Sequence, residues 1–194
     1  MADTFDDVRK VAEGCGFSHI GEISVDKIKL RKEARDMCAV NKCGSYGKTW
    51  SCPPGCGTLE ECDAMIRKYS RGLLLQTTAE LEDDFDWETM EKTLIEHKKH
   101  IGDFHKIINT KYSGTFLVIG ESCERCEKCT YPEKPCRFPD SLSYSLEGLG
   151  IIVSELCKEN DIPYYYGTRT LTYHGAVLIN IQTSQVMAVA AEKF

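Results

Sequence analysis

Eight of the eleven cysteines in this 194-residue chain lie in two short stretches. The second stretch, residues 121–140, carries three thiols separated by two residues each, and a fourth follows after six more: Cys123, Cys126, Cys129 and Cys136. A C-x2-C-x2-C run in a loop lets three thiolates converge on one inorganic cubane, and Cys136 is the most economical fourth ligand. The spacing therefore predicts a [4Fe–4S] cluster on these four cysteines.

Two alternatives to this assignment stay open. Structural zinc also takes four thiolates, although usually from two separated C-x2-C pairs, which a triple run matches less well. In two-cluster ferredoxins the last cysteine of such a run serves the other cluster, so Cys136 is the least firmly assigned of the four.

The first stretch contains Cys38, Cys43, Cys52 and Cys56, with gaps of four, eight and three residues. Four thiolates at these spacings are compatible with a second cluster or with zinc. If Cys56 is a ligand of this metal centre, four thiolates fill its coordination positions. If it does not, one iron keeps a position for water, substrate or a small anion, much as catalytic zinc keeps one site free.

The chain resembles, over nearly its whole length, the predicted metal-binding proteins that carry domain of unknown function 2284. The resemblance rests on two segments, GSYGKTWSCPP and CERCEKCTYPEKPCRFPDSLSYSLEGLGI. The matching positions are Cys38, Cys43, Tyr46, Gly47, Lys48, Trp50, Cys52, Pro53 and Pro54, and then Cys123, Cys126, Cys129, Pro135, Cys136, Arg137, Pro139, Ser145, Glu147 and Gly150. It implies metal binding, through iron–sulfur chemistry, and no defined reaction.

Composition narrows the function classes. A net charge of -6 gives no basic footprint for nucleic acid, and no apolar run approaches the roughly 20 residues of a membrane span. The N-terminus, MADTFDDVRK, is too acidic for a signal peptide, so we expect a cytoplasmic protein. Clustered thiols in a reducing compartment indicate metal binding or redox chemistry rather than disulfides.

These observations together favour an iron–sulfur protein of an oxygen-avoiding microbe. Its expected work is electron transfer with a redox partner protein, or the reduction of a small-molecule substrate. The alternatives are a non-redox zinc scaffold and a carrier or sensor whose clustered thiols capture metal.

Patterning predicts an α/β or α+β fold, with strands alternating with helices in one compact layered domain over 1–194 that could divide into lobes 1–80 and 81–194. Helices are expected at 4–14, 58–69, 86–109 and 142–159, and strands at 17–25, 71–78, 115–119, 164–166 and 171–179. Both cysteine stretches, rich in glycine and proline, are expected to be loops between a strand and a helix. His97, on the long helix, is expected to be solvated, and Cys62 and Cys157 to be buried as small apolar side chains.

Overall fold

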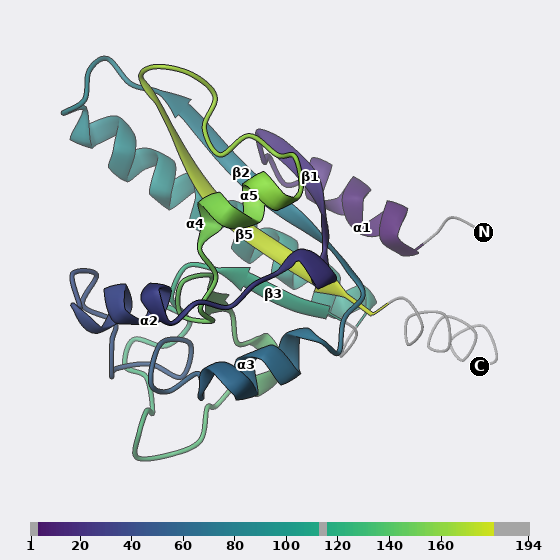
Figure 1. Ribbon diagram of the computed structural model, residues 1–194, viewed down its shortest axis with the longest axis vertical. Helices are drawn as coiled ribbons and strands as arrows, with labels where there is room; N and C mark the ends of the chain where they lie inside the picture. Colours follow the sequence, from purple (N-terminus) through teal and green to yellow (C-terminus); the bar gives the residue numbers. More distant parts are fainter. Residues whose placement is uncertain (1–3, 113–115, 181–194) are drawn as a thin grey trace.

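The structure, a computed structural model, describes residues 4–112 and 116–180 (Figure 1). The elements are α1 (Thr4–Glu13), β1 (His19–Ser24), the 3-10 turn η1 (Val25–Lys27), α2 (Lys32–Ala39), α3 (Leu59–Ile66), β2 (Arg71–Glu80), α4 (Trp87–Lys111), β3 (Phe116–Gly120), the 3-10 turn η2 (Pro139–Ser141), β4 (Tyr144–Ser145), α5 (Val153–Glu159) and β5 (Thr170–Ile179). The predicted mixed fold of helices and strands is confirmed, as one domain around one sheet.

The sheet has the strand order β1-β2-β5-β3-β4. All neighbouring strands run antiparallel except β3 and β4, which are parallel. The two long strands β2 and β5 lie in the middle and pair from Arg71 opposite Ile179 to Glu80 opposite Thr170. The sheet thus joins β1 and β2, from the first half of the chain, to strands from the second half.

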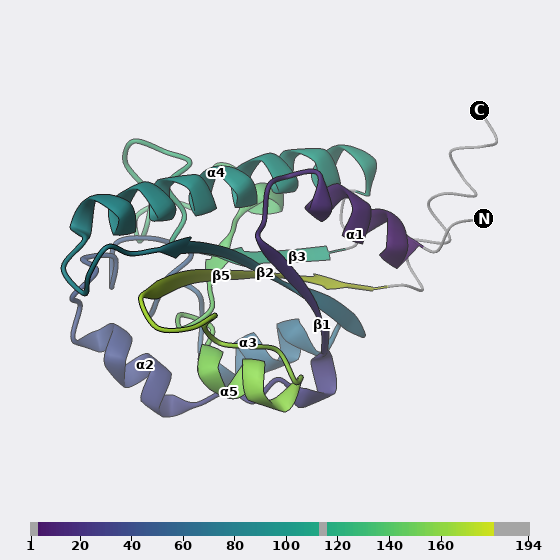
Figure 2. The same ribbon diagram turned by 90° about the horizontal axis from the view of Figure 1, so that it is seen from above.

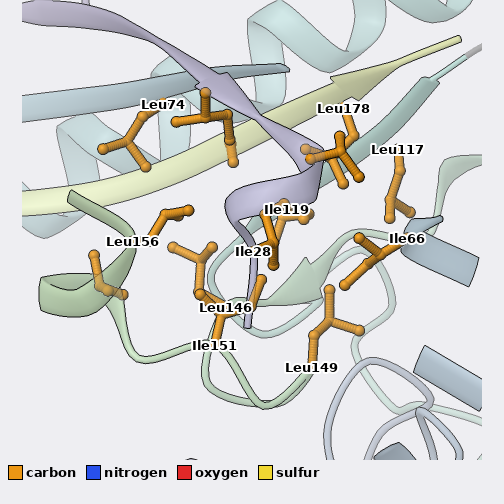
Figure 3. Packing of buried hydrophobic residues seen from close by; sticks show 14 of the residues in the cluster. Ile28, Ile66, Leu74, Leu117, Ile119, Leu146, Leu149, Ile151, Leu156 and Leu178 are labelled. Carbon is orange, nitrogen blue, oxygen red and sulfur yellow. The ribbon is translucent and has the colours of Figure 1, made fainter. Parts of the chain in front are cut away.

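Helices cover both faces of the sheet, with α1 and α4 on one face and α2, α3 and α5 on the other (Figure 2). Successive residues of β2 supply the two cores alternately, because side chains of a strand point to opposite faces. Leu73 and Leu75 pack under α1 and α4, whereas Leu74 packs against the α3 and α5 side. Figure 3 shows this second core, in which Ile66 and Leu149 are neighbours.

The helix predicted for 142–159 is wrong in its first half. Residues 144–145 form β4 beside β3, and α5 begins only at Val153. Ser145 Oγ accepts a hydrogen bond from the Gly148 backbone amide at 3.0 Å, and Gly150 has a φ of +95°. That φ is unfavourable for any residue with a Cβ, so the chain turns here instead of winding into a helix.

The strand predicted for 164–166 is also wrong, because these residues form a loop in which two of the three tyrosine rings stack on histidines. Tyr164 stacks on His174 with ring centroids 5.1 Å apart, and Tyr166 stacks on His19 at 3.6 Å. The Tyr166 hydroxyl donates to Gln76 Oε1 at 2.8 Å. The segment therefore covers the sheet as a loop that its ring contacts hold in place.

His97 is fully buried against the sheet, contrary to the expectation of a solvated face. Its Nδ1 lies 2.9 Å from Thr77 Oγ1, and its Nε2 has no hydrogen-bond partner among the described residues. Burial, and to a smaller extent the charges of His174 and His100, lower the pKa of His97 from 6.5 to about 4. The ring is thus held neutral inside the fold.

This burial predicts a pH-dependent stability. The unfolded chain binds the proton of His97 near pH 6.5 and the folded chain only near pH 4. The free energy of unfolding should therefore fall as the pH drops through that window, by roughly 3 kcal/mol at most from this group. Urea unfolding of wild type and His97→Gln at several pH values measures the difference. Equal pH dependence in both proteins would contradict the assignment.

Candidate metal centre

Three thiols of the first cysteine stretch face one cavity. Cys38 lies in the last turn of α2, and Cys43 and Cys52 follow in the loop that leads to α3. All three line a cavity of about 670 Å³, which we call the thiol cavity. Glu121 and Glu147 line it from the second half of the chain, so distant segments of sequence complete it.

The thiols of this cavity interact electrostatically. The pKa of Cys38 is raised to about 11, first by burial, then by the charge of Glu147 and by Cys52 and Cys43, while Arg35 opposes the rise. Such a thiol stays protonated at neutral pH unless a cation compensates its charge. A metal ion or cluster would supply that charge and displace the proton, as thiolate ligation requires.

Cys52 is nine-tenths buried and is held among hydroxyl groups. Its Sγ lies 3.7 Å from Ser51 Oγ and 3.9 Å from Ser145 Oγ, within reach of weak hydrogen bonds to sulfur. The Ser51 hydroxyl also lies 3.0 Å from Thr49 Oγ1 and accepts from the Cys123 backbone amide at 2.9 Å. Hydrogen bonds to ligand sulfurs tune the potential of a metal centre.

Cys56 points away from the thiol cavity. Its Sγ donates to the Gly148 carbonyl at 3.2 Å, and the residue packs against the buried core beside α3. The structure therefore brings Cys38, Cys43 and Cys52 together around the thiol cavity, whereas Cys56, although its charge interacts with that of Cys52, is not among the residues that line it.

The second stretch, which we call the 121–140 loop, extends from the end of β3 to η2. Its turns are closed by hydrogen bonds from the Lys134 amide to the Thr130 carbonyl at 3.0 Å and from Arg137 Nη1 to the Lys128 carbonyl at 3.0 Å. Cys136 Sγ accepts from the Phe138 amide at 3.4 Å. The four thiols of this loop are all half-buried.

The spacing of possible donor side chains limits what a single metal ion could bind. Within the described residues, no three His, Cys, Asp or Glu side chains converge closely enough to hold one metal ion. Thiolates around a single zinc, with bonds of about 2.3 Å, must lie roughly 4 Å from one another.

The two cysteine loops lie against each other at the lower end of the molecule in Figure 1. Ser45 Oγ lies 3.1 Å from Ser122 Oγ, and Trp50 Nε1 donates to the Lys134 carbonyl at 3.1 Å. The Trp50 ring also meets Tyr131 edge-on at 4.9 Å. Any two centres in these loops would therefore be neighbours.

A second cavity, of about 410 Å³, lies between α4 and the 121–140 loop. Cys123, Lys98, Lys106 and Arg125 are among its lining residues, as is Ser143, whose buried hydroxyl has no partner among the described residues. Cavities of this size accommodate small ligands. Lys98, ion-paired with Glu124 at 2.6 Å, lines both cavities, so they share a wall.

Two carboxyl groups at the cavities, those of Glu121 and Glu147, were not identified from the sequence as site residues. Desolvation is the main cause that raises the pKa of both Glu121 and Glu147, and the charge of Glu147 raises the pKa of Glu121 further. Glu147 remains solvent-accessible on the cavity wall, although many protein atoms surround its carboxyl group. Both could balance a cationic group in the cavity or hold protons beside it.

Comparison with known proteins gives one match. The model of a family described as predicted metal-binding protein (DUF2284) matches residues 21–179. No curated protein and no solved structure matches. In addition, no described helix has the length and apolar character that crossing a membrane requires.

Proposed function

Because the chain belongs to the DUF2284 family of predicted metal-binding proteins, we propose that it is an iron–sulfur protein. One [4Fe–4S] cluster would be held by the four thiols of the 121–140 loop and a second by the three thiols of the thiol cavity. The observation that carries the proposal is the arrangement of Cys38, Cys43 and Cys52 around one cavity of about 670 Å³. The triple C-x2-C-x2-C run supports the first cluster independently.

The second cluster would have one iron without a cysteine ligand. Cys56 donates to a backbone carbonyl instead of facing the cavity, while Lys42, Lys98 and Glu147 do line it. Such an open coordination position binds water or an exogenous ligand, as the open site of catalytic zinc does. This favours a reduction at the thiol cavity over electron relay alone.

Several residues of the chain would have defined roles in this function. Bound [4Fe–4S] clusters accept and donate single electrons. Ser51 and Ser145 would hydrogen-bond the Cys52 sulfur, and Trp50 would keep the two loops together. The thiol cavity would admit a small-molecule substrate beside the open iron, and a partner protein would deliver the electrons.

Anaerobic purification followed by iron, acid-labile sulfide and zinc analysis tests this function. We expect brown protein with iron and sulfide in near-equal amounts, and a low-temperature electron paramagnetic resonance signal after reduction. Stoichiometric zinc without sulfide would overturn the proposal in favour of a non-redox scaffold.

A further inference from the structure

The second cavity, of about 410 Å³, is built on one face of helix α4. Lys98, Gly102, His105 and Asn109 line it at steps of three or four residues, and residues at such steps share one face of a helix. Most of the remaining lining comes from residues 121–125, which directly follow β3. The cavity therefore belongs to the contact between α4 and the 121–140 loop.

Gly102 leaves the helical wall of this cavity open. Glycine inside a helix lowers its stability relative to alanine, because the glycine backbone has more conformational freedom to lose. A Cβ built at Gly102 would meet nothing within 4 Å, and its backbone is not in the positive-φ region that favours glycine. No contact among the described residues therefore accounts for this glycine, whereas space for a ligand does.

The charged side chains that line the cavity leave an excess of positive charge. Lys98, Lys106 and Arg125 supply three cations, and Glu121 and Glu124 supply two carboxyl groups. Lys98 and Glu124 offset each other in an ion pair of 2.6 Å. Two cations then remain against Glu121, so the lining is net positive even with that carboxyl ionised. In a chain of net charge -6 such a site favours an anionic ligand.

The two remaining cations keep charge available for that ligand. The Arg125 guanidinium lies over the Phe138 ring, 5.2 Å from its centroid, in a contact that orients the cation without cancelling its charge. Within the part of the chain that the structure describes, Arg125 forms no ion pair with a carboxylate. Lys106 lies 3.5 Å from Asp103, a carboxylate that also pairs with Lys99 at 2.8 Å. A guanidinium binds carboxylate and phosphate groups through two parallel hydrogen bonds.

The cavity also offers neutral hydrogen-bond donors. The buried Ser143 hydroxyl has no partner among the described residues, and leaving such a group unpaired is costly. Asn109 Nδ2 donates to Ser141 Oγ at 3.1 Å, so the hydroxyl proton of Ser141 is directed elsewhere. Hydroxyl donors beside cations are suited to a ligand that presents several oxygen atoms.

We propose that this cavity is a binding site for a small oxyanion, a carboxylate or a phosphate group, held by Arg125 and Lys106 with the Ser143 hydroxyl as a neutral donor. The proposal goes beyond the metal centres and does not depend on them. Cys123 lines the same cavity, which adjoins the thiol cavity, so the bound anion would lie beside both cysteine loops.

Isothermal titration calorimetry of the anaerobically purified full-length protein, in a buffer free of oxyanions, tests the proposal. The probes are sodium phosphate and, in a separate titration, sodium succinate. We expect one binding site per chain for at least one of them. Tighter binding of phosphate assigns the site to a phosphate group, and tighter binding of succinate assigns it to a carboxylate. Absence of binding for both probes would overturn the proposal.

Three variants test the residues of the site. Arg125→Gln should weaken binding of the tighter probe by about tenfold or more, because a charged hydrogen-bond donor is lost. Ser143→Ala should weaken it by about fivefold, as expected for one neutral hydrogen bond. Gly102→Leu should abolish binding, since leucine is compatible with a helix and its side chain would occupy the open wall.

A matched pair of lysines provides the control. Lys106 and Lys99 both pair with Asp103, but only Lys106 lines the cavity. Lys106→Gln should weaken binding by about tenfold, and Lys99→Gln should retain the wild-type affinity. Equal losses in the two lysine variants, or unchanged binding in Gly102→Leu, would show that the probe binds elsewhere and would overturn the proposal. Iron and sulfide analysis of the same samples keeps this outcome separate from the iron–sulfur assignment.

Discussion

Replacement of Cys126 by serine is expected to remove the iron and the reduced-state paramagnetic signal of the cluster in the 121–140 loop, or to convert that signal to a different type. The middle cysteine of a C-x2-C-x2-C run has no redundant neighbour, and a serine hydroxyl is a poor ligand for this cluster. Iron and sulfide analysis with low-temperature electron paramagnetic resonance measures the loss.

The matched control is Cys15→Ser. Cys15 is also half-buried, but it directly follows α1 and lies outside both cysteine loops. This variant should retain wild-type iron, sulfide and spectrum. Unchanged iron in Cys126→Ser, or equal loss in Cys15→Ser, would refute the assignment of the cluster to this loop.

The elements that could be predicted from sequence are those with long apolar patterns. Strands β2 and β5 form the centre of the sheet, so each carries a continuous apolar run that is buried on both faces. Helix α4, 25 residues long, repeats its pattern over many turns, and Ile101, Phe104 and Ile108 are buried as the periodicity predicts. Trp87, at its first position, is 70% exposed, because the helix extends past the core at this end.

The short elements could not be predicted from the sequence, because they lack a long apolar pattern. Helix α2 has eight residues and Ala34 is the one among them that is buried, so it presents no apolar stripe. Strand β4 has two residues and exists only because β3 lies beside it. Such elements form because the rest of the fold holds them in place, and isolated helices of this length are marginal.

The candidate site, too, could be predicted only in part from the sequence. The spacing of the cysteines along the chain was enough to predict two groups of ligands, because the ligands of one centre commonly lie close together in sequence. The orientation of Cys56 is set by the Gly148 carbonyl, 92 residues away in sequence, and Arg35 meets Cys62 from a different helix. Contacts of that range have no local signature in the sequence, so the thiol cavity could be recognised only in the folded chain.

Cys52→Ala and Cys56→Ala should therefore have opposite effects, although three residues separate them. Cys52→Ala removes a buried sulfur that lines the thiol cavity and should abolish the second cluster, while the signal of the 121–140 loop persists. Cys56→Ala removes one hydrogen bond to a carbonyl and should keep both clusters, with about 1 kcal/mol lost from the free energy of unfolding.

Metal and sulfide content of the two variants, with cyanide titration of the wild type followed spectroscopically, provides the measurement. Cyanide should perturb only the cluster of the thiol cavity, because that cluster alone would have an iron without a cysteine ligand. Loss of a whole cluster in Cys56→Ala would mean that this thiol turns into the cavity when metal binds, closing the site with four thiolates. The first loop would then be a structural or electron-carrying centre. Retention of both clusters with a cyanide-sensitive spectrum would instead establish the open site on which a reduction at this cavity depends.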